Sequence, residues 1–255
     1  MNNPLVIAHR GNSSSAPENT LAAIREAIDL GTDCVEVDIR CTKDSVPILI
    51  HDPAIGRVTG DMGNVSDLTL NEIHALHVSA QNDDTKYPRE RIPTFEEALL
   101  EAKEKTNLVA EMKVDCVDQI TGILRRLGVE RGVSFAGFRI EMLQRIYRAL
   151  PSFEVAWLLT APQWIDSNSA KTIETASESE INLVVPPLPA ITASSVCCAH
   201  EVGLRVWTWE CETADDFAKA VAAGVDGIVT NAPHELLAFL RDRGRRKEMM
   251  NDETE

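Results

Sequence analysis

Short β-branched runs alternate with amphipathic stretches along most of the 255-residue chain, and this alternation constrains the fold more than any other feature. The stretches between the runs have apolar residues at helical spacing, as in 19–31, which closes at Gly31. Eight runs are typical of strands: 5–9, 34–39, 108–113, 133–138, 154–159, 182–186, 205–209 and 227–230. Eight strands alternating with eight helices predict an α/β fold, a (β/α)8 barrel of the TIM type, whose usual length is about 250 residues. A doubly wound open sheet is the alternative, although no G-x-G-x-x-G motif follows the first strand.

One segment breaks the alternation. Residues 34–39 and 46–52 are both strand-like, and only a short turn separates them. Because a link that short permits a hairpin but no parallel crossover, we expect 46–52 to pair antiparallel with the second strand. A turn centred near residues 43–45 sets position 36 opposite 51–53, so His51 is expected to lie next to Glu36.

Residues 53–92 precede the third barrel strand and are expected to form a small insertion after strand 2. Residues 67–76 have helical spacing, with a cap expected at Ser66 or Asp67, and 82–91 are typical of an exposed loop. Insertions after a barrel strand lie at the catalytic face, so we expect this one to cover the site. The chain is therefore expected to form one domain over 1–243, followed by a flexible charged tail over 244–255.

Charge and hydrophobicity exclude several classes of protein. The 25 basic and 40 acidic residues give a formal net charge of −15, which argues against binding to nucleic acids and docking on anionic membranes. A small anionic substrate remains compatible with this charge, because a metal ion or a few cations can reverse the local field. The sequence has neither an apolar run of about 18 residues nor a basic start followed by a secretory apolar run. We therefore expect a cytoplasmic protein without membrane insertion, and we make no prediction of its oligomeric state.

Carboxylates gather at the ends of two predicted strands. Glu36 and Asp38 are two residues apart, so their side chains share one face of a strand, and Glu111 ends the next barrel strand. Carboxylates that converge on one place repel one another, and a hard divalent cation such as Mg²⁺ or Ca²⁺ would relieve that repulsion. Ion pairs with Arg40, Lys113 or other cations are the structural alternative.

Histidine and basic side chains stand at the same strand ends. His9 and His51 are candidates for an acid and a base, because imidazole titrates near neutral pH. Arg10 and Lys113 are candidates for binding an anion, with balancing of the carboxylates as the alternative role.

Two tryptophans end the seventh predicted barrel strand. Trp207 is a candidate for an apolar wall of the substrate pocket, with core packing as the alternative. Of Trp207 and Trp209, we expect one to face the barrel mouth and the other to face the helices.

These residues together resemble the glycerophosphodiester phosphodiesterase family. The motifs that carry the resemblance are His9-Arg10-Gly11, Pro17-Glu18-Asn19-Thr20, Glu36-x-Asp38, His51-Asp52, Ile92-Pro93-Thr94, Glu111-x-Lys113, Ser134-Phe135, Trp207-Thr208 and Gly224-Val225-Asp226-Gly227-Ile228-Val229-Thr230. Each motif is weak alone, but their ordered combination over residues 5–235 is specific.

The resemblance implies a (β/α)8 barrel that hydrolyses a small-molecule glycerophosphodiester to an alcohol and glycerol 3-phosphate. It also implies the residues of the site: Glu36, Asp38 and Glu111 for one divalent cation, Mg²⁺ or Ca²⁺, Arg10 and Lys113 for the phosphate, and His9 and His51 as the general acid–base pair. We expect His9 to be the base and His51 the acid.

The sequence departs from the family pattern at three places. A small apolar residue and Asn usually follow Trp-Thr, whereas Trp209 and Glu210 stand here, so the site could be narrower or accept a different alcohol. The last strand usually ends in Thr-Asp, but here it ends in Thr230-Asn231, where Asn is expected to cap the following helix. Residues 77–91 lack the usual Leu-Asp-x-Gly.

Three other functions stay open at this point. A lysophospholipase D-like phosphodiesterase would release a lipid phosphate and would need an apolar groove. A barrel that binds phosphodiesters without turnover is disfavoured, because both histidines and all three carboxylates are kept. An aldolase would use Lys113 as a Schiff base.

Overall fold

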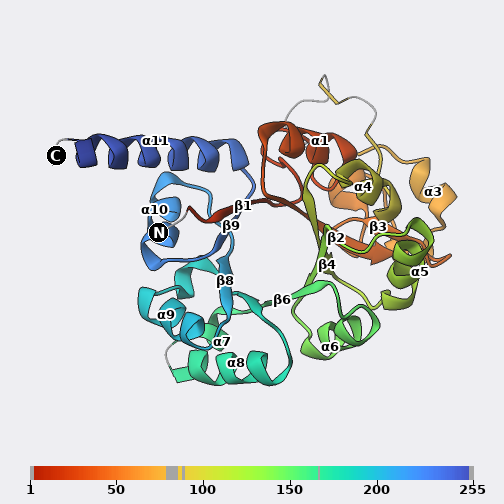
Figure 1. Cartoon of the computed structure of the whole chain (residues 1–255). Helices are drawn as coiled ribbons and strands as arrows, with labels where there is room; N and C mark the ends of the chain where they lie inside the picture. Colours follow the sequence, from red (N-terminus) through yellow and green to blue (C-terminus); the bar gives the residue numbers. More distant parts are fainter. Residues whose placement is uncertain (1–2, 79–85, 88–89, 166, 253–255) are drawn as a thin grey trace.

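Parallel strands close into a barrel surrounded by helices (Figure 1). The computed structural model describes residues 3–78, 86–87, 90–165 and 167–252. The strands follow one another around the barrel in the order β1-β9-β8-β7-β6-β5-β4-β2, and pairing of β1 with β2 closes it. Their bounds are β1 Leu5–Ala8, β2 Cys34–Cys41, β4 Asn107–Met112, β5 Val133–Gly137, β6 Glu154–Leu158, β7 Leu183–Val185, β8 Arg205–Thr208 and β9 Gly227–Thr230. This closure confirms the predicted (β/α)8 barrel and excludes the open sheet.

Helices follow the barrel strands and cover their outer face. The bounds of the longer ones are α1 Leu21–Leu30, α4 Phe95–Ala102, α5 Val117–Leu127, α6 Ile140–Ala149, α8 Ser167–Glu178, α9 Ala193–Glu201, α10 Ala214–Ala223 and α11 Pro233–Asp252, with the short α7 Ala161–Trp164 and the 3-10 turn Leu188–Ala190 between them. Local residues set the helix ends: the Thr20 side chain accepts from the backbone N–H of Ala23 at the start of α1, and Gly31 ends it with φ 76°.

The predicted hairpin is present. Strand β3, Pro47–Leu49, pairs antiparallel with β2 in the register Ile39–Leu49 and Cys41–Pro47. The backbone N–H of Ile50 donates to the carbonyl of Asp38 at 3.0 Å, which continues the pairing toward the barrel mouth. Ile39 pairs with Leu49, so the same antiparallel register continued by three residues places residue 36 opposite residue 52. This position falls within the predicted range 51–53.

The insertion contains α2 Gly56–Thr59, the 3-10 turn Val65–Asp67 and α3 Leu70–His74. The cap predicted at Ser66 or Asp67 is wrong, because Thr69 caps α3 in a capping box with Glu72. Most of the loop predicted at 82–91 lies outside the described residues. A small apolar core joins the insertion to the hairpin and is made of Ile48, Ile50, Ile55, Val58, Val65, Ile73, Val78 and Ile92.

The charged C-terminal segment begins within a helix. Helix α11 continues to Asp252, so residues 244–252 are helical, and the predicted flexibility of 244–255 stays a prediction. Buried Leu236 and Leu240 hold the first turns of α11, and a helix once nucleated propagates through Arg, Lys, Glu and Met at little cost. In the described residues, no helix is both long and apolar enough to cross a membrane.

Strand alternation decides which side chains reach the inside of the barrel. In β2, Val35 and Val37 belong to the large core between the strands and the helices. Glu36 and Asp38 therefore point to the other face, into the barrel. Close packing below the site depends on Gly227, because a Cβ there would lie 2.5 Å from Trp207 Cδ1. The barrel thus presents buried carboxylates above an apolar floor.

Candidate active site

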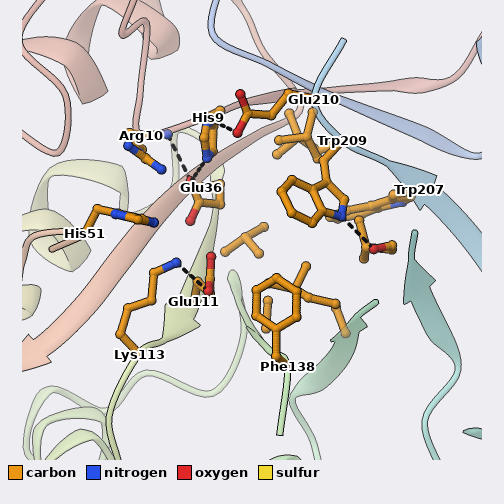
Figure 2. A pocket seen from close by; sticks show the side chains of 17 residues that line it. His9, Arg10, Glu36, His51, Glu111, Lys113, Phe138, Trp207, Trp209 and Glu210 are labelled. Atoms are coloured by element: carbon orange, nitrogen blue, oxygen red, sulfur yellow. Dashed lines mark hydrogen bonds and ion pairs between the residues drawn. The ribbon is translucent and has the colours of Figure 1, made fainter. Parts of the chain in front are cut away.

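A pocket opens at the carboxyl ends of the barrel strands and has two unlike halves (Figure 2). The polar half is lined by His9, Arg10, Glu36, His51, Glu111, Lys113 and Glu210. The apolar half is lined by Ile7, Val109, Ala136, Phe138, Ala156, Leu158, Val185, Trp207, Trp209 and Val229. Reactive groups therefore lie on one side of the pocket, and hydrocarbon surface on the other.

The predicted carboxylates do converge. Glu36, Asp38 and Glu111 are buried, and one oxygen of each lies within 4.8 Å of the others. Burial and the negative charges of its neighbours raise the pKa of Glu36 well above its ordinary value, and burial also raises the pKa of Glu111. Glu36 Oε1 is buried and accepts no hydrogen bond from the described residues. A buried orphan oxygen in a set of hard oxygen donors fits a divalent cation.

Two cations already balance part of this charge. Lys113 Nζ lies 2.6 Å from Glu111 Oε1 and 3.0 Å from Asp38 Oδ1. Arg10 Nε lies 3.1 Å from Asp38 Oδ2. Burial alone would raise the pKa of Asp38, but Lys113, Arg10 and a hydrogen bond from Asn19 outweigh it and lower that pKa. The ion-pair alternative is thus realised for Lys113, and Arg40 instead donates to the backbone carbonyl of His51 at 2.8 Å.

A tight turn after β1 places His9 and Arg10. Arg10 adopts φ 56°, and Gly11 follows with φ 83°, where a Cβ would lie 2.6 Å from Ala23. The turn lets the backbone N–H of Arg10 donate to Glu36 Oε2 at 3.0 Å. His9 Nε2 lies 3.8 Å from the same Glu36 oxygen. Burial and the charge of Arg10 lower the pKa of His9, which favours its neutral form.

His51 reaches the pocket from the end of the hairpin and is held by a carboxylate. Its Nδ1 lies 2.7 Å from Asp52 Oδ1, and Arg57 Nε donates to the other oxygen of Asp52 at 2.5 Å. Arg57 also contacts Glu18, which in turn accepts from Arg10 at 3.1 Å. His51 thus differs from His9, because a carboxylate lies within hydrogen-bond distance of its ring, whereas the carboxylates nearest His9 are 3.8 and 3.9 Å away.

Aromatic side chains form the far wall. Phe138 and Trp209 meet edge to face, with ring centroids 5.8 Å apart. The indole N–H of Trp209 donates to the carbonyl of Val185 at 2.9 Å, so the ring offers carbon atoms to the pocket. Ala136 and Ala156 leave space beside this wall.

The expectation that one tryptophan faces the helices is wrong. Trp207 and Trp209 both line the pocket, because residues two apart on a strand share a face. The predicted pocket residue Trp207 is almost fully buried, at 3% exposure, and forms part of the floor. Phe138 and Leu158 were not among the candidates, although each extends the inward-facing row of its strand past Ala136 and Ala156.

Asn231 was also missed as a site residue. Its side-chain contacts in the described part of the chain run to Ser13, His9, Glu210 and Glu212, and none runs to the first turn of α11. The expected capping role is therefore replaced by a contact with His9. Glu210, the other departure beside it, lies 3.9 Å from His9 Nδ1.

Comparisons with known proteins agree with this architecture. The sequence model described as the glycerophosphoryl diester phosphodiesterase family matches residues 9–235. A glycerophosphodiester phosphodiesterase of Caldanaerobacter subterraneus is 30% identical over 94% of this chain and 99% of its own length. An Oleispira antarctica phosphodiesterase, solved in complex with the product sn-glycerol-3-phosphate, superposes with TM-score 0.85 at 23% identity, covering 94% of this chain and 97% of that one. An Agrobacterium tumefaciens glycerophosphodiester phosphodiesterase gives TM-score 0.79 at 22% identity, covering 92% and 99%.

Proposed function

Because the chain belongs to the glycerophosphoryl diester phosphodiesterase family, we propose that it hydrolyses glycerophosphodiesters to an alcohol and glycerol 3-phosphate, using a divalent cation and two histidines. The observation that carries the proposal is the meeting of His9, His51 and the carboxylates of Glu36, Asp38 and Glu111 at one pocket. The named relative of similar length and the product bound to the Oleispira protein support the same reaction class.

Glu36, Asp38 and Glu111 would hold the cation, Mg²⁺ or Ca²⁺. The donor set is oxygen only, and the unpartnered Glu36 Oε1 is available to it. When bound, such a cation neutralises the phosphodiester and stabilises the charge that gathers in the transition state. Lys113 contacts two of these carboxylates, so it is positioned to share its charge between them and the substrate phosphate.

The two histidines have unlike surroundings, which support unlike roles. His9 is buried and kept neutral, so its Nε2 can accept the proton of the attacking hydroxyl as a general base. His51 is paired with Asp52, which would balance the imidazolium that donates a proton to the leaving alkoxide. The nucleophile is either the substrate's own glycerol hydroxyl or water.

Arg10 completes the phosphate site. Its guanidinium lies between Asp38 and Glu18 and lines the pocket, where its remaining N–H groups can donate to a phosphate oxygen.

The contacts of Lys113 disfavour a Schiff-base aldolase, because Asp38 and Glu111 raise the pKa of Lys113 although burial opposes them. A lysine held as its ammonium ion is a poor nucleophile.

A second candidate function draws on the apolar half of the pocket. Phe138 is 40% exposed at the mouth and packs on Trp209, whose indole N–H is already bonded. This wall would suit a phosphodiester that carries a hydrocarbon group, as a lysophospholipase D-like activity requires. The small Ala136 and Ala156 would leave room for that group.

Product release tests the first proposal. Glycerol 3-phosphate is measured from glycerophosphocholine, glycerophosphoethanolamine and glycerophosphoglycerol, first with a chelator and then with Mg²⁺ or Ca²⁺. We expect cation-dependent release that is lost in His9→Ala and kept in the control His200→Ala, because His200 lies on α9 and contacts Asp226. Release that survives both the chelator and His9→Ala would refute the proposed chemistry.

Lysophosphatidylcholine distinguishes the second candidate. If the wall binds hydrocarbon, hydrolysis of this lipid should fall in Trp209→Ala and Phe138→Ala, while hydrolysis of glycerophosphocholine should change much less. Equal loss of both activities would assign the wall a packing role, and no hydrolysis of the lipid would reject the candidate.

A further inference from the structure

The side of His9 that faces away from the pocket is held by an amide. His9 Nδ1 lies 2.8 Å from Asn231 Oδ1, across 222 positions of sequence. Closure of the barrel makes this contact, because β1 pairs with β9 and the backbone N–H of His9 donates to the carbonyl of Thr230 at 2.9 Å. His9 is 8% exposed, so solvent does little to orient its ring.

The side-chain amide of Asn231 could in principle be rotated so that its oxygen and nitrogen exchange places, and the carboxylate of Glu212 decides between the two orientations. The side-chain N–H of Asn231 donates to Glu212 Oε1 at 2.9 Å, and the backbone N–H of Asn231 donates to the same oxygen at 3.2 Å. Since that oxygen accepts two hydrogen bonds, the amide oxygen of Asn231 cannot face it without repulsion. Glu210 lies on the same side, 3.4 Å from Asn231 Nδ2.

Ser13 and His9 alone would not decide the direction. The Ser13 hydroxyl lies 2.8 Å from both Asn231 Oδ1 and the carbonyl of His9, so it could donate to Asn231 or, in the turned amide, accept from it. A neutral imidazole likewise donates or accepts at Nδ1. Glu212 is therefore the group that fixes the donors and acceptors among Asn231, Ser13 and His9.

We propose that Asn231, oriented by Glu212, is a positioning residue that holds the proton of neutral His9 on Nδ1 and leaves a lone pair on Nε2 facing the pocket. An oxygen acceptor 2.8 Å from Nδ1 requires an N–H there. Glu210 lies 3.9 Å from Nδ1 and Glu36 lies 3.8 Å from Nε2, so their charges act in opposite directions and the closer contact with Asn231 decides the tautomer. The consequence for catalysis rests on the proposed function, in which Nε2 of His9 accepts the proton of the nucleophile.

Nitrogen NMR reads the tautomer without any substrate. The full-length protein is labelled with ¹⁵N-histidine in Mg²⁺ buffer, and the His9 ring signals are assigned by their loss in His9→Gln. We expect a protonated Nδ1 and an unprotonated Nε2 for His9. His200 is an internal reference of the opposite kind, because its Nε2 lies 2.9 Å from Asp226 Oδ2 and should carry the proton.

Three variants separate orientation from packing. In Asn231→Leu, His9 should lose its Nδ1–H preference. Glu212→Leu leaves Asn231 in place but frees its amide to turn, so it should give a mixture of tautomers. Glu212→Gln keeps an oxygen acceptor for the backbone N–H of Asn231 and should retain the Nδ1–H form.

Kinetics then give a second readout. We expect kcat for glycerophosphocholine to fall about 10- to 100-fold in Asn231→Leu, with little change in KM, because a misplaced proton affects chemistry more than binding. Glu212→Gln should recover most of the activity that Glu212→Leu loses.

Each outcome decides the proposal. A wild-type His9 with its proton on Nε2, or an Nδ1–H signal that persists in both Asn231→Leu and Glu212→Leu, would overturn it. The Nδ1–H form present in the wild type and lost in these variants would uphold the positioning role. If the tautomer behaves as expected but no glycerophosphodiester is cleaved, the proposed function fails and the positioning role stands. Should Asn231→Leu fail to fold, the two Glu212 variants still decide between these results.

Discussion

Replacing Lys113 by methionine should make the stability of this protein depend strongly on a divalent cation. Lys113 lies 2.6 Å from Glu111 and 3.0 Å from Asp38, and the three side chains are 13%, 9% and 0% exposed. Methionine keeps a similar unbranched shape but removes the charge. The carboxylates of Glu36, Asp38 and Glu111 would then be balanced by Arg10 alone among the cations that contact the cluster in the described residues.

The expected loss is large without metal. Removing one partner of a buried ion pair costs about 3–5 kcal/mol, because the remaining charge stays buried and unpaired. For a chain of this size, 1 kcal/mol corresponds to roughly 2–4 °C in the melting temperature, so we expect Lys113→Met to melt about 10 °C lower in a chelator. Mg²⁺ at a hundredfold excess over its Kd should return about 2.7 kcal/mol.

Thermal unfolding followed by circular dichroism, in chelator and in Mg²⁺, measures both effects. Lys105→Met is the matched control, because Lys105 pairs with Glu101 on the surface at 50% exposure and its loss should cost less than about 0.5 kcal/mol. A melting temperature of Lys113→Met that is the same in chelator and in Mg²⁺ would refute the reasoning, since the carboxylates would then not form a cation site.

Three further predictions test other parts of the site. Burial raises the pKa of Glu36 and Glu111, so their contribution to the stability of the metal-free protein falls as pH rises above about 4.5, whereas His9, whose pKa is lowered, contributes in the opposite direction. In urea unfolding, the stability difference between Mg²⁺ and chelator should therefore widen as pH rises above about 5, because the cation replaces those protons. Gly227→Ala should cost about 1–3 kcal/mol in urea unfolding and change the fluorescence of Trp207, because the new Cβ would lie 2.5 Å from that ring; unchanged values would mean that the floor can move. His51→Ala should hydrolyse glycerophosphocholine slowly, but its activity should be largely restored with a nitrophenyl phosphodiester, because nitrophenolate leaves without being protonated. Absence of that restoration would argue against His51 as the acid.

The sequence alone determined the barrel, the hairpin and the carboxylate cluster. Strand period is local, so the i, i+2 spacing of Glu36 and Asp38 sets a shared face before any tertiary contact forms. Chain order then brings Glu111 beside them, because β4 pairs with β2 and Glu111 lies opposite Asp38. The short link to β3 likewise left the hairpin as the only pairing that the chain could reach.

Only the tertiary structure decided which groups complete the site. Asn231 reaches His9 because barrel closure pairs the first strand with the last, a contact that no local pattern encodes. Phe138 and Trp209 meet across strands far apart in the chain, so their shared wall depends on the curvature of the barrel. Whether Lys113 balances carboxylates or faces solvent likewise depends on packing around it. Local periodicity sets the face of each side chain, whereas its partners are set by how distant strands close on one another.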